Sequence, residues 1–65
     1  MLNPEKIADK LKKLRGAKTQ KEVADAVNIS VSAIAMYETG KRIPRDKIKV
    51  ALARYFDKTV EEIFF

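Results

Sequence analysis

The sequence predicts an all-α domain of five short helices. Apolar residues recur at helical spacing, residues that cap or end helices interrupt them at short intervals, and no segment alternates long enough to predict a strand. The chain has 65 residues and no cysteine, so its core has to come from packing without disulfides. We therefore expect one domain spanning residues 1–65.

Capping residues delimit the first two helices. Asn3 and Pro4 suit the start of the first helix, and Gly16 suits its end. Thr19 begins the second helix, and Glu22 three residues later predicts a capping box. The apolar faces of the two helices are formed by Ile7, Leu11, Leu14, Val23, Ala24 and Val27.

The third helix follows a tight turn. Asn28 is one of the few residues besides glycine that tolerate the left-handed conformation. Ser30 caps a helix that we expect to run to Thr39 and to be closed by Gly40. The loop after it contains Pro44, which biases the preceding residue away from helical geometry.

The last two helices complete the chain. The fourth is predicted to start at Arg45 or Asp46 and to run through Phe56. Thr59 and Glu62 predict a second capping box for the fifth helix. That helix has an apolar face formed by Val60, Ile63 and Phe64.

The second and third helices have the spacing of a helix-turn-helix over residues 20–39. Two helices that cross steeply after a turn of about three residues nearly touch, so a small residue such as Ala24 is needed at the contact. Large apolar residues then fill the wedge below them, and Ile29, Ile34 and Tyr37 occupy the corresponding positions. Such a motif projects its second helix into the major groove of DNA.

The basic composition has two interpretations, a polyanionic partner or a soluble domain that is simply rich in lysine, and the sequence offers no catalytic set. The net charge of +5 points to nucleic acid first and to an anionic membrane second. The chain has no histidine, no cysteine nucleophile and no glycine-rich phosphate loop, so we expect no enzymatic activity, no metal and no cofactor. Residues 1–6 lack the apolar run of a secretory signal and no later segment resembles a membrane span, so we expect the cytosol.

The stretch TQKEVADAVNISVSAIAMYETGKRIP resembles the Cro/C1-type (XRE) repressors of bacteria and their phages, and LKKLR before it and ALARYFDKTVEEIF after it extend the likeness. The resemblance implies a lambda-repressor-like DNA-binding domain. The sequence departs from the family pattern at two places. The link between Arg15 and Gln20 is shorter than usual, and Asn28 replaces the usual turn glycine.

The resemblance also implies roles for individual side chains. The positions at which the family reads bases are held by Val31, Ser32, Ala35 and Met36. Phosphate contacts are implied for Gln20, Thr39, Lys41 and Arg42. None of the base-reading residues gives bidentate readout, so we expect contacts with thymine methyl groups and recognition of DNA shape. For Met36 the alternative is a place in the core.

Two further pairs have structural roles. Arg15 and Glu38 match a pair that forms a salt bridge in relatives, and the alternative is two unrelated surface charges. Phe64 and Phe65 are assigned to a dimer seam because family dimers often pair through this end. Packing of Phe64 within its own chain is the alternative.

Together these features predict a transcription regulator that binds double-stranded DNA. We expect a homodimer that represses by occupying an inverted-repeat operator. An antitoxin-like module that uses the helix-turn-helix to bind a protein partner is the main alternative. A domain that lies on anionic lipid is a third and less favoured interpretation.

Overall fold

The computed structural model describes residues 3–65, which form five α-helices and contain no strand. The helices are α1 (Pro4–Arg15), α2 (Gln20–Ala26), α3 (Val31–Glu38), α4 (Asp46–Tyr55) and α5 (Val60–Phe64). The predicted all-α fold is therefore confirmed, although α3 and α4 each end one residue earlier than expected. Residues 1–2 of the expected domain lie outside the described residues.

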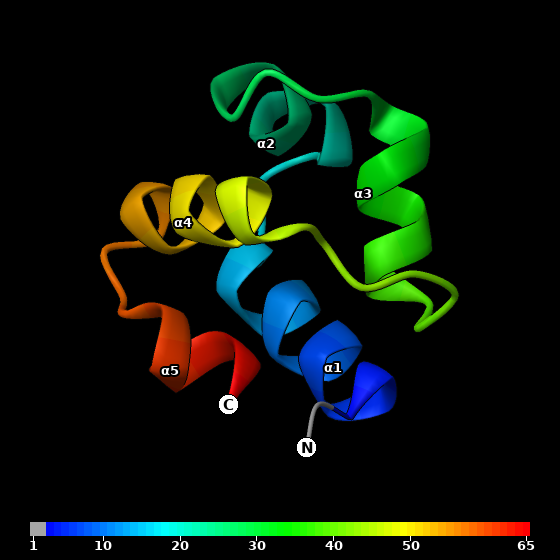
Figure 1. Cartoon of the computed structure of the whole chain (residues 1–65). Coiled ribbons are helices and arrows are strands. Elements are labelled where there is room, and N and C mark those ends of the chain that lie inside the picture. Colours follow the sequence, from blue (N-terminus) through cyan, green and yellow to red (C-terminus); the bar gives the residue numbers. More distant parts are fainter. Residues whose placement is uncertain (1–2) are drawn as a thin grey trace.

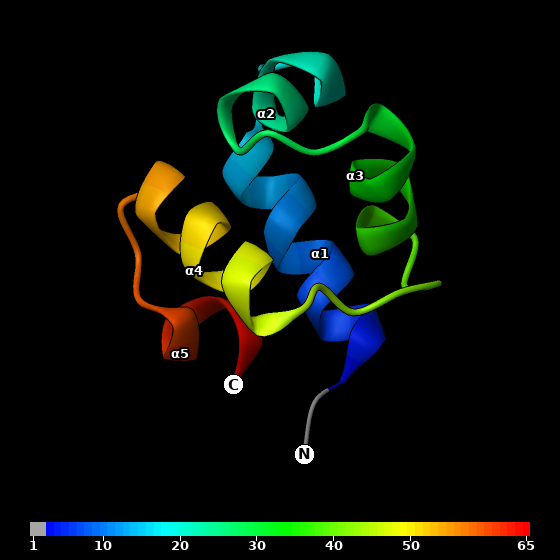
Figure 2. The same ribbon diagram turned by 45° about the horizontal axis from the view of Figure 1, so that its top comes forward.

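The helices pack around α1. Figure 1 shows α1 near the centre, with α3 on one side of it and α5 on the other. The turned view keeps α3 and α5 on these opposite sides, and α2 crosses above the end of α1 (Figure 2). The core takes side chains from every helix: Ile7, Leu11, Val23, Ala24, Ile34, Tyr37, Leu52, Ala53, Ile63 and Phe64. Each large apolar side chain buried in this way stabilises the fold by roughly 1.5–3 kcal/mol.

The two terminal aromatic residues have different environments. Phe64 is only 2% exposed and packs in the core of its own chain, whereas Phe65 is 71% exposed. The expectation that Phe64 lies in a dimer seam is therefore corrected, because the helical spacing of Val60, Ile63 and Phe64 turns them to one inner face. The ammonium group of Lys49, a buried residue, lies 5.3 Å from the centre of the Phe65 ring.

Three helices end in the same hydrogen-bonded motif. After α2, α3 and α4 a residue with positive φ reverses the chain, namely Asn28 (60°), Gly40 (73°) and Asp57 (57°). The next N–H then donates to the carbonyl group five residues earlier, with N···O distances of 2.9, 3.0 and 2.9 Å for Ile29, Lys41 and Lys58. This is the Schellman arrangement, which satisfies otherwise unpaired helix carbonyls.

The helix starts match the sequence prediction except at one capping box. Thr59 and Glu62 form both bonds of the box in α5, and the Thr59 N–H lowers the pKa of the Glu62 carboxyl below its ordinary value. At α2 only one bond is present, from the Glu22 N–H to the Thr19 hydroxyl oxygen at 3.0 Å. The predicted box at α2 is therefore half formed.

The short link between α1 and α2 is a tight turn. Gly16 has φ 55° and ψ −124°, and the Lys18 N–H donates to the Arg15 carbonyl at 3.0 Å. These values correspond to a type II′ turn, which requires a residue that accepts positive φ at its second position. The turn brings the start of α2 over the end of α1 (Figure 2).

Candidate nucleic-acid interface

The orientation of α3 is set by its start and by its inner face. The Ser30 hydroxyl oxygen accepts a hydrogen bond from the Ala33 N–H at 3.0 Å, which fixes the first turn. Ile34 and Tyr37 are buried in the core. Since residues three and four apart share a helix face, the opposite side of α3 is left to solvent.

That outer side carries the predicted base-reading residues. Val31, Ser32 and Met36 are exposed, and Ala35 is half-buried. Met36 is 36% exposed, so the alternative that it belongs to the core does not hold. The surface is uncharged and mainly apolar, as the sequence predicted, and its contact with bases stays a prediction.

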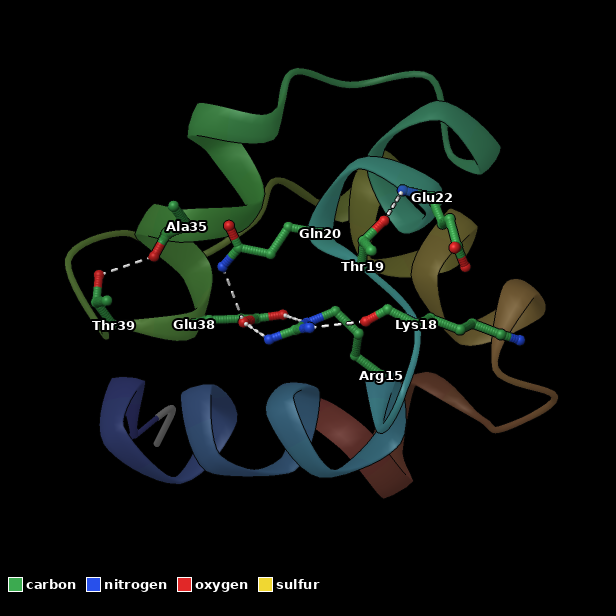
Figure 3. A network of polar contacts seen from close by, with 8 residues as sticks. All are labelled: Arg15, Lys18, Thr19, Gln20, Glu22, Ala35, Glu38 and Thr39. Carbon is green, nitrogen blue, oxygen red and sulfur yellow. Dashed lines mark hydrogen bonds and ion pairs between the residues drawn. The ribbon is translucent and has the colours of Figure 1, made fainter.

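A partly buried ion pair fixes α3 against α1. The Arg15 guanidinium meets the Glu38 carboxylate side-on, with Nε 2.7 Å from Oε2 and Nη2 2.9 Å from Oε1 (Figure 3). Glu38 is only 5% exposed. The remaining guanidinium arm, Nη1, donates to the carbonyl oxygen of Lys18 at 2.8 Å. Bidentate pairs of this kind add geometric specificity as well as energy, so the end of α3 has a defined position relative to α1.

The ion pair supports the charge of Arg15. The hydrogen bond to Glu38 raises the pKa of the Arg15 guanidinium above its ordinary value, so Arg15 stays charged at any physiological pH. Among residues 3–65 no buried side-chain polar atom lacks a hydrogen-bond partner. The buried carboxylate is thus fully satisfied, which is the condition under which a buried charge is tolerated.

Gln20 belongs to the same network. Its amide nitrogen donates to Glu38 Oε1 at 3.2 Å, and its amide oxygen points away from that carboxylate (Figure 3). The sequence predicts a phosphate contact for Gln20, with a solvated surface side chain as the alternative, and it does not indicate the bond to Glu38. A carboxylate has about four lone-pair sites, so the predicted Arg15–Glu38 pair left spare acceptors for a neighbour at the start of α2.

The remaining predicted phosphate contacts lie at the end of α3. The Thr39 hydroxyl donates to the carbonyl oxygen of Ala35 at 2.9 Å (Figure 3), so a phosphate contact through its proton would require this bond to break. Lys41 and Arg42 are exposed in the loop that follows. None of the ion pairs formed by the described residues involves either of these two cations. Lys41 and Arg42 are therefore better placed than Thr39 to meet a phosphate.

A family model described as helix-turn-helix matches residues 6–63. The chain belongs to the Cro/C1-type helix-turn-helix family. This is a family of DNA-binding transcription regulators and not of enzymes. Searches of curated proteins and of solved structures gave no match.

Two other features are absent from residues 3–65. Across residues 3–65 no three acidic, histidine or cysteine side chains gather as they would around a metal ion. In the same residues no helix is long and apolar enough to cross a membrane.

Proposed function

We propose that this regulator binds DNA sequence-specifically and acts as a dimeric repressor on an inverted-repeat operator. One observation carries the proposal. The exposed, uncharged face of α3 is held by the partly buried Arg15–Glu38 pair and is followed at once by Lys41 and Arg42, which form no ion pair among the described residues. A rigid helix flanked by free cations is the arrangement that major-groove reading requires.

In the proposed complex α3 lies in the major groove. Val31 and Met36 contact thymine methyl groups, and the Ser32 hydroxyl bonds a base edge or a phosphate. Lys41 and Arg42 neutralise phosphates beside the groove, and release of counterions supplies much of the affinity. Because no side chain on this face is an Arg, Asn or Gln, discrimination relies on methyl contacts and on the shape of the duplex.

A dimer fits the geometry of such an operator. A twofold dimer needs half-sites about one DNA turn apart, which is ~34 Å between centres. The longest dimension of the protomer is 28 Å, so two copies can lie side by side on one face of the duplex. Phe65, rather than Phe64, is the terminal aromatic residue available for their contact. The proposed repression is by occupancy of the operator.

Selection from a randomised duplex pool tests this proposal. We expect enrichment of inverted repeats with T-rich half-sites one turn apart, and a protein–DNA mass that corresponds to two chains per duplex in sedimentation. A pool that stays random after repeated rounds, at a salt concentration at which DNA is still retained, would contradict sequence-specific binding.

Lys41→Ala should weaken binding to all duplexes alike. Because it removes one phosphate contact, the slope of log affinity against log salt concentration should become shallower by about one unit. Lys58→Ala, at an exposed position between α4 and α5, is the matched control and should leave the slope unchanged. A slope that does not change in Lys41→Ala would remove Lys41 from the proposed phosphate contacts.

Met36→Ala tests the reading of thymine. Replacing thymine by uracil in the half-site removes only the 5-methyl group and should lower the affinity of the parent. The Met36→Ala variant should bind less tightly and be indifferent to the change at one position, since both alterations remove one contact. Its melting temperature should stay near that of the parent because the side chain is exposed. If the losses of binding free energy from Met36→Ala and from the uracil replacement were fully additive, Met36 would not contact the methyl group.

The exposed Val31 and Met36 also support a second candidate, a protein-binding module that uses the same face. An apolar helix face can lie in the groove of a partner protein as well as in DNA. Gel shifts with duplexes at rising salt separate the two functions. If rising salt releases all duplexes from the protein equally, whatever their sequence, the protein-binding function is favoured.

A further inference from the structure

A second surface lies between α1 and α5, away from the reading helix. It is an open groove lined by Lys10, Lys13, Leu14, Lys58, Glu62 and Ile63. Leu14 is half-buried against the core and, with the buried Ile63 beneath it, forms the apolar floor of the groove. A concave surface that is mainly apolar and carries a few polar groups is typical of a binding site.

Polar contacts hold the walls of the groove in place. The Lys10 ammonium donates to the carbonyl oxygen of Glu62 at 3.0 Å and so joins α1 to α5. The Glu62 carboxylate is turned to the backbone of its own helix, where it accepts from the Thr59 N–H at 2.9 Å. The only acidic side chain of the lining is thus engaged in a cap.

The rim is positively charged. Three lysines line the groove against one glutamate. Lys13 and Lys58 are exposed, and neither takes part in the ion pairs found in residues 3–65. An apolar floor between free ammonium groups is complementary to a ligand that is apolar on one side and negatively charged on its flanks.

We propose that this groove binds an acidic amphipathic helix of a partner protein. Apolar side chains of the partner lie on Leu14 and on the aliphatic stems of the lysines, while its carboxylates pair with Lys13 and Lys58. A nucleic acid backbone would satisfy the lysines but would leave the apolar floor exposed. The floor and the rim together therefore favour a protein segment over a second nucleic acid.

The position of the groove allows both surfaces to act at once. α3 and α5 lie on opposite sides of α1 in both views (Figures 1 and 2). A partner in the groove would leave α3 free, so a regulator on its operator could hold that partner at the same time. Simultaneous binding of the operator and the partner rests on the proposed function, whereas binding of the partner segment alone does not.

The test uses the ¹⁵N-labelled full chain and a synthetic acidic amphipathic peptide. A peptide of about 15 residues, with leucines on one face and Glu and Asp elsewhere, is long enough to form a marginal helix. We expect chemical-shift changes centred on Lys13, Leu14, Lys58 and Ile63, with an affinity that falls as salt is added. The peptide should cause the same chemical-shift changes when DNA is bound to α3.

Two double variants test whether the lysines on the rim of the groove contribute to peptide binding. Lys13→Gln combined with Lys58→Gln should bind the peptide about fivefold more weakly, as expected for two exposed ion pairs. Lys47→Gln combined with Arg54→Gln removes the same charge from exposed positions on α4 and should keep the parent affinity. Equal weakening in both pairs would mean non-specific attraction and overturn the proposal.

Three other results would also overturn it. The first is equal binding of a peptide in which lysines replace the acidic residues. The second is a set of chemical-shift changes confined to α3. The third is a short DNA duplex that perturbs the groove residues more than the peptide does, which would assign the groove to nucleic acid.

Discussion

Replacing Arg15 by alanine should destabilise the domain by about 3 kcal/mol, the effect expected when one partner of a buried ion pair is removed. Glu38 is 5% exposed and would keep only the amide of Gln20, at 3.2 Å, as a side-chain partner. The uncompensated carboxylate then opposes folding and loosens the end of α3. Denaturation by urea, followed by far-UV circular dichroism, measures the loss.

Two comparisons make this prediction specific. Lys21→Ala breaks the exposed pair with Asp25, whose atoms are 2.8 Å apart, and should cost only about 0.5 kcal/mol. Replacing Arg15 by Met and Glu38 by Leu together should cost less than Arg15→Ala alone, because no charge is left buried. If Arg15→Ala were as mild as Lys21→Ala, the pair would not be what holds α3.

Replacing Ala24 by leucine should have the next largest effect. Ala24 has 0% of its surface exposed, and its backbone carbonyl accepts the Ile29 N–H that closes the turn of the motif. A larger side chain has to push α2 away from α3, at a cost of about 1–3 kcal/mol through overpacking. DNA affinity should fall with it, because the angle between the two helices sets the direction in which α3 projects.

Ala26→Leu is the matched control for this substitution. Ala26 lies on the same helix but is exposed, so the added side chain should change stability by no more than about 0.5 kcal/mol. Melting curves and a binding titration on both variants give the answer. An Ala24→Leu variant that melts like the parent and still binds DNA would show that helices α2 and α3 do not depend on this close contact.

Interactions local in sequence determined where the helices begin and end. Asn3, Thr19 and Ser30 cap their helices as predicted, since a capping side chain reaches only the next few N–H groups. Asn28 and Gly40 take the positive φ that the turns required. The sequence alone therefore determined five helices, their order and the inner face of most of them.

The tertiary structure decided what those faces and side chains meet. A periodic pattern gives the apolar side of a helix but not its neighbour. The spacing puts Phe64 on one face with Val60 and Ile63, but only the packing of the chain shows that Phe64 is buried within one protomer and not against a second copy. The bond from Gln20 to Glu38 joins residues 18 positions apart, beyond the reach of any local rule. The basic groove likewise exists only because α1 and α5, which lie at opposite ends of the chain, are brought together by packing.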